Sequence, residues 1–227
     1  MNTTVKTDLI IDLAFAAYRV NNGYVKATQR YSEGQPTTFS NKELITFTAH
    51  SEWQPEDFVA LTVTEEDKEA RKKCDKHMRR YTMLAMGDLP QFEDDLFQAY
   101  NSEETNISRV GLVAYLPAFI DRELANKEYK LRLRTEFNES KHLNGDRLEP
   151  TEVEILKVIP LNNDFMEQAF MHFGAIGKDL VCFTVKNKFT VNNTYDIVAR
   201  IKGQDYERES KTPMTRLNYV KLRKQEA

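Results

Sequence analysis

Apolar residues recur with a helical period along the first part of the chain. In residues 7 to 20, Leu9, Leu13 and Val20 fall on one face of a helix, together with the alanines between them. Thr7 is a suitable capping residue for its start, and Asn21-Asn22-Gly23 is a typical stop. The pattern therefore predicts an amphipathic helix near the N-terminus.

Start and stop signals predict further helices downstream. Ser40-x-x-Glu43 has the form of a capping box and precedes a short apolar run. Thr64-x-x-Asp67 opens a long charged segment that Gly87 would end, and Leu89-Pro90 precedes another apolar face. A last helix is expected from Pro117 to about residue 137.

After residue 150 the helical period gives way to alternation typical of strands. Five short runs of β-branched, aromatic and alternating residues are separated by turn signals. The expected strands are 152–161, 169–174, 179–186, 195–202 and 215–222. The expected turns are Asn162-Asn163, 174–177, Asn192-Asn193 and 203–210. Five short strands suit a small closed barrel, which leaves no exposed strand edge.

The two patterns divide the chain. Residues 138–150 are polar and contain Asn144-Gly145 and Pro150, which is typical of a boundary between domains. We therefore predict an α+β protein: a mostly helical domain in residues 1–140, followed by a small five-stranded β-barrel in residues 141–227.

Composition and charge narrow the possible functions. Hydrophobic residues make up 41% of the 227 residues and charged residues 30%, which permits a packed core and argues against a disordered chain. The net charge of −3 excludes a uniformly basic surface that coats DNA, so a nucleic-acid site would be a local patch. No apolar run approaches the roughly 20 residues that span a bilayer.

Charge is distributed unevenly between the two parts. Residues 178–227 carry 11 Lys and Arg against 6 Asp and Glu, whereas residues 1–150 carry 20 against 25. Aromatic residues interleave with the basic ones, and single-strand binders combine cations for the phosphates with aromatic faces for the bases. The candidate nucleic-acid-binding residues are Lys186, Lys188, Arg200, Lys202, Tyr206, Arg208, Lys211, Arg216, Tyr219 and Lys221. The loop from Gly203 to Pro213 is the best single candidate for contact. A structural alternative is that Phe183, Tyr195 and Tyr219 fill the barrel and the lysines are its solvated surface.

Several strings in the sequence resemble a known class of phage proteins. They are Gly145-Asp146-Arg147, 153–155, 196–202 and 215–222, with 17–26 near the N-terminus. They resemble an oligonucleotide-binding (OB) type of module of tailed-phage replication and DNA-processing proteins, in which a Thr-x-Leu-Asn-Arg-Val-Lys pattern is frequent. Tyr219 stands here at the usual arginine. The resemblance implies an OB-type barrel and a role in DNA replication or recombination.

Other clusters have simpler explanations. Cys74-x-x-His77 has the spacing of a metal-binding pair, but a second pair is missing from the sequence. The acids at 93–95 could hold Mg²⁺ or face solvent on a helix. The bases at 71–80 could face phosphates, but acids early and bases late also match the helix dipole. Gly174-x-x-Gly177-Lys178 resembles a hairpin turn more than a phosphate loop.

These observations favour a single-stranded DNA-binding protein that acts in phage DNA replication or recombination, with replication or recombination proteins as further partners. The alternative is a phage adaptor or host-takeover protein whose barrel binds a protein partner. A nuclease with dispersed carboxylates is the least supported hypothesis. No cofactor, metal or catalytic residue is assigned. The polar Met1–Lys6 segment and two cysteines far apart lead us to expect a cytoplasmic protein, in the host cytoplasm if phage-encoded.

Overall fold

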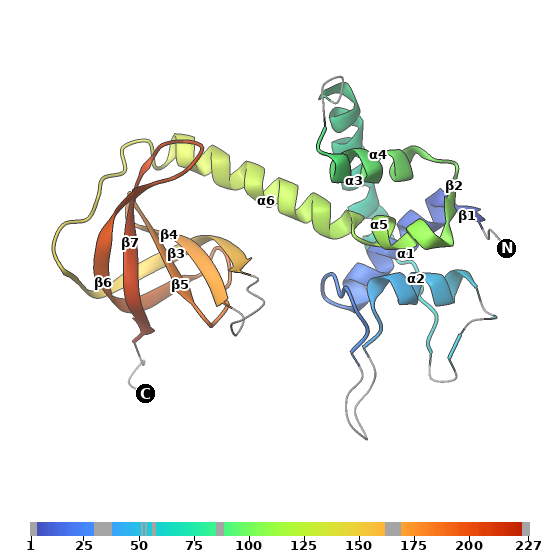
Figure 1. Ribbon diagram of the computed structural model, residues 1–227, viewed down its shortest axis with the longest axis horizontal. Coiled ribbons are helices and arrows are strands. Elements are labelled where there is room, and N and C mark those ends of the chain that lie inside the picture. The colour runs from blue at the N-terminus through green and yellow to red at the C-terminus, as the bar shows by residue number, and fades with distance from the viewer. Residues whose placement is uncertain are drawn as a thin grey trace. The chain divides into compact units, whose positions relative to one another are not determined.

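The chain forms two compact units in a computed structural model (Figure 1). The units are Met1–Glu123 and Leu124–Ala227, and they divide inside a long helix. The structure describes residues 4–29, 38–50, 52, 54–55, 58–84, 89–161 and 169–223. Each unit is treated by itself below.

The first unit is mostly helical, as the sequence predicts. Its elements are β1 (Thr4–Lys6), α1 (Thr7–Val20), α2 (Asn41–Ala49), α3 (Glu65–Leu84), α4 (Gln91–Asn101), β2 (Glu104–Asn106), the 3₁₀ helix η2 (Ile107–Arg109), α5 (Val110–Ala114) and the start of α6 (Leu116–Thr135). α1 packs against α2, α3 and α5, while β1 and β2 form an antiparallel pair. Ile10, Ile45 and Val113 are among the fully buried residues of this core.

Local capping signals define the starts of α2 and α3. The Ser40–Glu43 capping box is formed, with the Ser40 hydroxyl accepting a hydrogen bond from the Glu43 amide at 3.2 Å. Asp67 accepts from the Thr64 amide at 2.8 Å, so the second predicted box is also present. The prediction for Thr7 was wrong. Lys6 occupies the N-cap position of α1, and the buried Thr7 hydroxyl hydrogen-bonds instead to the hydroxyl of Thr105 at 2.8 Å.

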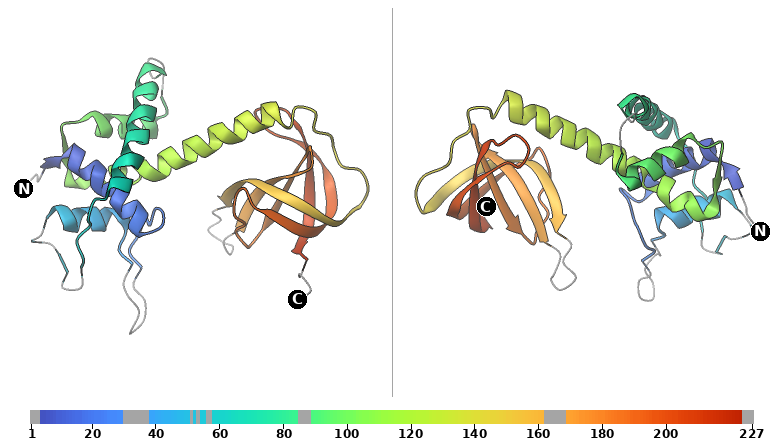
Figure 2. Two further views of the ribbon diagram at one scale, coloured as in Figure 1. Left: turned by 180° about the vertical axis from the view of Figure 1, so that it is seen from behind. Right: turned by 45° about the horizontal axis from the view of Figure 1, so that its top comes forward.

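The second unit contains the predicted barrel. Its strands are β3 (Arg147–Leu161), β4 (Ala169–Ile176), β5 (Asp179–Val185), β6 (Thr194–Tyr206) and β7 (Pro213–Leu222). They close in the order β3-β4-β5-β7-β6, with β5 and β7 parallel and the other neighbours antiparallel. Figure 2 shows the same strands from two further sides. The fold is therefore α+β with an OB-like barrel, and the predicted class is confirmed.

Two clusters of buried side chains hold this unit together. Inside the barrel, Val153, Ile155 and Ile197 pack with Phe183 and Phe189. At one end, residues from the second half of α6 and just after it pack on the strands; they are Tyr129, Leu133 and Phe137. Burial of this apolar surface is the main stabilising contribution, at about 25 cal/mol per Å².

The turns differ from the prediction at two hairpins. β6 continues through Tyr206, since residues 203–206 pair with 213–216 of β7. The predicted turn at 203–210 was therefore placed too early, and the connection is 207–212. Gly174 lies inside β4, and the turn after it centres on Gly177 and Lys178. The predicted stop at Gly87 and turn at Asn162-Asn163 lie outside the described residues.

Candidate nucleic-acid interface

The outer surface of β6 carries exposed cations because its side chains alternate between the core and the solvent. Ile197 and Ala199 are buried, whereas Arg200 and Lys202 are exposed. On β7, Leu217 is buried and Arg216 is exposed. The strand pattern that builds the core therefore also directs these basic side chains outward.

A β-bulge in β7 alters this alternation. The four residues 218–221 of β7 pair with the three residues 198–200 of β6. Tyr219 lies in the bulge with a φ of 51°, in the left-handed region, and 74% of its surface is exposed. The structural alternative, in which Tyr219 fills the barrel, was wrong because the extra residue of the bulge shifts the register and places Tyr219 on the outer face.

Arg200 lies against the exposed tyrosine. Its guanidinium carbon is 5.6 Å from the centroid of the Tyr219 ring. A cation–π contact of this kind at an exposed site contributes about 0.5–1 kcal/mol. The contact orients both side chains on the outer surface of the barrel.

The structure adds Arg147, which the sequence analysis did not assign to the site. It begins β3, earlier than the predicted strand, and lies directly opposite Arg200 in the β3–β6 register. Both residues are exposed. Like charges directly opposite each other destabilise an antiparallel pair. The sequence signal was the string Gly145-Asp146-Arg147, but its place beside β6 depends on the long-range register.

We refer to Arg147, Arg200, Lys202, Arg216, Tyr219 and Lys221 together as the basic face. Within the described residues, no ion pair is found for Arg147, Lys202 or Lys221. Arg216 has a loose contact with Asp205, with 3.6 Å between nitrogen and oxygen. The basic face therefore retains most of its positive charge for a ligand.

The remaining predicted residues lie at the two ends of the barrel. Arg208 and Lys211 are exposed in the connection 207–212, while Lys186 and Lys188 are exposed in the connection after β5. The antiparallel pairing of β6 with β7 and the parallel pairing of β5 with β7 put these two connections at opposite ends. The structure thus brings some of the predicted residues together and separates these four.

The 207–212 connection has acidic side chains among its basic ones. Burial opposes ionisation of Glu207, but hydrogen bonds from the amides of Ser210 and Glu209 outweigh it and lower the pKa of Glu207. Glu209 forms an ion pair with Lys130 at 2.6 Å. These carboxylates offset the charge of Arg208 and Lys211, so the loop is a weaker phosphate site than its basic residues alone suggest.

The aromatic residues divide into core and surface. Phe183 and Phe189 are buried around His172, whose ring stacks on Phe183 with centroids 5.1 Å apart. The Tyr195 ring stacks on Phe189 at 4.5 Å. The structural alternative, in which these aromatic residues fill the barrel, is therefore confirmed for Phe183. Tyr195 is half-buried. Two tyrosines remain for a ligand: Tyr219, and Tyr206, which is 55% exposed and contacts the His142 ring edge-on.

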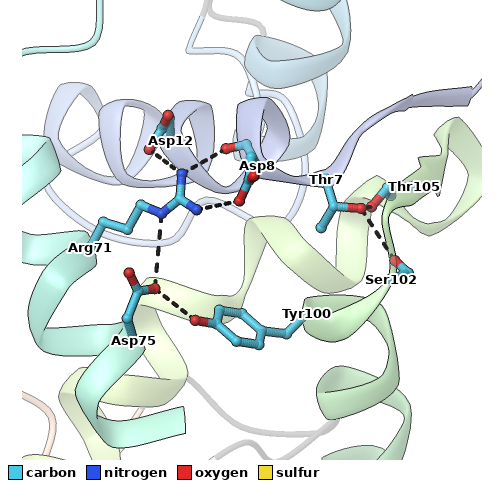
Figure 3. A network of polar contacts seen from close by, with 8 residues as sticks. All are labelled: Thr7, Asp8, Asp12, Arg71, Asp75, Tyr100, Ser102 and Thr105. Atoms are coloured by element: carbon cyan, nitrogen blue, oxygen red, sulfur yellow. Dashed lines mark hydrogen bonds and ion pairs between the residues drawn. The ribbon is translucent and has the colours of Figure 1, made fainter. Parts of the chain in front are cut away.

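The other candidate clusters have structural partners. Arg71 of α3 donates to the Asp12 carboxylate at 2.7 Å and also pairs with Asp8, which joins α3 to α1 (Figure 3). Tyr100 donates to Asp75, a further neighbour of Arg71, at 2.7 Å. This part of the basic cluster therefore holds two helices together.

The metal hypotheses gain no support in the described part of the chain. No group of three or more His, Cys, Asp or Glu residues there could hold a metal ion. Burial raises the pKa of the Cys74 thiol to about 12, which disfavours the thiolate that a metal needs. Gln91 and Gln98 donate to Asp95 and Asp94, two of the acids at 93–95.

Comparison with protein-family models, curated proteins and solved structures found no match to this chain. Each helix within the described residues is too short or too polar to cross a membrane.

Proposed function

We propose that this protein binds single-stranded DNA on the basic face of its barrel. The observation that carries the proposal is the exposed Tyr219 beside Arg200, on a surface where Arg147, Lys202 and Lys221 form no ion pair with any residue that the structure describes. Cations bind phosphates, and an aromatic side chain stacks on a base for about 1–3 kcal/mol. The setting we propose, phage DNA replication or recombination, rests on the sequence resemblance.

Several features support a single strand over a duplex. The face combines an accessible aromatic ring with cations, and bases offer their faces for stacking only when they are unpaired. Its cations come from neighbouring strands of one small barrel, and OB-type barrels bind oligonucleotides on strand faces and in adjoining loops. Without the five cations of the basic face, the net charge of the chain would fall from −3 to −8, which favours this patch over the rest of the surface for an anionic ligand.

Fluorescence anisotropy with a labelled 20-nucleotide oligo-dT tests the proposal. We expect the full chain to bind, with affinity falling steeply between 50 and 200 mM salt, since each phosphate contact on a single strand contributes about 0.7 to the slope of log K against log salt. The double variant Lys202→Ala/Arg216→Ala should bind more weakly, with a smaller slope.

A matched control removes one lysine and one arginine from elsewhere in the second unit. Arg134 and Lys178 are both exposed, on α6 and in the β4–β5 turn. Arg134→Ala/Lys178→Ala should bind like the wild type. Absence of wild-type binding at micromolar protein and 50 mM salt would rule out the proposal, as would equal losses in the two double variants. Tighter binding of an oligo-rU of the same length would contradict the assignment to DNA.

A further inference from the structure

We infer that the β-bulge of β7 holds the Tyr219 ring as a stacking platform for one base, with Arg200 behind the ring and the Arg147–Arg200 pair binding the adjoining backbone phosphate. This inference rests on the proposed function and assigns roles within it. It commits to a ligand that presents an unpaired base next to a phosphate.

The backbone at Tyr219 is strained, with a φ of 51°. The left-handed conformation is unfavourable for any residue with a Cβ. Bulge positions with a positive φ are therefore commonly occupied by glycine. The other non-glycine residues with positive φ in the described chain are Asn22, Asn192 and Lys211, which lie in turns or loops. Tyr219 has this conformation inside a strand. Strain of this kind persists where other interactions fix it, and it clusters at binding sites.

The side chain does not offset this strain by burial. Three quarters of Tyr219 is exposed, and its one ring contact in the described chain is with Arg200, which is itself exposed. A large aromatic residue at a strained and solvated position therefore contributes little to the barrel. A ligand that covers the open side of the ring would account for both features.

The arginine pair supplies the second half of the site. Arg147 and Arg200 face each other across β3 and β6, on the outer side of the barrel, and Arg147 has no ion pair among the described residues. Their neighbours along the ladder, Leu148 and Ala199, form the next cross-strand pair, and Ala199 is buried in the barrel core. An anion that binds between two like charges relieves their electrostatic repulsion. A phosphate can also accept hydrogen bonds from several guanidinium nitrogens.

The decisive variant separates folding from binding. Tyr219→Gly relieves the left-handed strain and removes the ring. We expect it to unfold at the same temperature as the wild type or a higher one, while its affinity for oligo-dT falls about tenfold. Tyr219→Phe retains the ring and should bind within about twofold of the wild type. Asn192→Gly relieves a similar φ of 65° in an exposed turn and should leave the affinity unchanged.

A positional readout checks the geometry. An oligo-dT with 5-iodouracil at single positions should crosslink on irradiation to the β7 peptide that contains Tyr219. Arg147→Gln should weaken binding and lower the salt slope by about 0.7, without lowering thermal stability.

Different results would refute the proposed function and the stacking inference. If the wild type does not bind oligo-dT, the proposed function is wrong, and the inference with it. If the wild type binds but Tyr219→Gly binds equally well, or crosslinks fall outside β7, the stacking platform alone is refuted. Unchanged affinity and salt slope in Arg147→Gln would refute the assignment of Arg147 and Arg200 as a phosphate-binding pair.

Discussion

The barrel core leaves no room for a side chain at Gly174 of β4. This residue is buried and pairs with Ile155 of β3 and Val181 of β5. A Cβ added there would lie 2.6 Å from a methyl group of Val153 and 2.9 Å from the carbonyl oxygen of Glu154. We predict that Gly174→Ala destabilises the second unit.

The magnitude follows from which atoms must move. Val153 is fully buried, and the Glu154 oxygen belongs to the backbone of β3, so neither yields easily. Overpacking of this kind costs about 1–3 kcal/mol. Replacing glycine by alanine also reduces the entropy of the unfolded chain, which returns about 0.4–1 kcal/mol. We therefore expect a net loss of about 1–2 kcal/mol in the free energy of unfolding.

Gly203 of β6 provides the matched control in the same barrel. A Cβ there meets no atom within 4 Å, and its φ lies outside the left-handed region. Gly203→Ala should leave the stability unchanged or raise it by up to about 1 kcal/mol. For a unit of this size, a difference of about 2 kcal/mol between the variants corresponds to about 10 °C in melting temperature.

The assay is differential scanning calorimetry of the full chain, with hydrogen exchange of β5 peptides to assign the transition to the barrel. Equal melting temperatures for Gly174→Ala and Gly203→Ala would refute the packing described for β3 and β4.

Two further predictions concern the helical unit and the buried histidine. Arg71→Met removes the hydrogen bonds that join α3 to Asp8 and Asp12, and should lower the stability of the first unit by about 1–2 kcal/mol in chemical denaturation. The exposed Lys72→Met should leave the stability unchanged. Burial lowers the pKa of His172 below its ordinary 6.5, so its contribution to stability is present above that pH and is lost as the pH falls below it. The melting temperature of the barrel should therefore fall from pH 7 to pH 5, and a His172→Gln variant with an equal fall would show that another group is responsible.

The sequence by itself determined the main helices, the presence of the five barrel strands and the class of fold. Capping at Ser40 and Thr64 depends on residues three positions apart, and the strands of the barrel follow from alternation within each segment. These signals are local, so they can be found along the chain. The local clustering of charge in the last part of the chain was also available from the sequence.

Only the tertiary structure decided which basic and aromatic residues lie together. The neighbourhood of Arg147 and Arg200 depends on a register between residues more than fifty positions apart. The outward position of Tyr219 depends on a bulge that alternation cannot reveal, because one extra residue exchanges the inner and outer faces. The separation of Lys186 and Lys188 from the 207–212 connection follows from strand direction within the closed barrel. The pattern of residues along the chain thus predicts the strands, whereas the pairing of distant strands decides which side chains lie together on the surface that could bind a ligand.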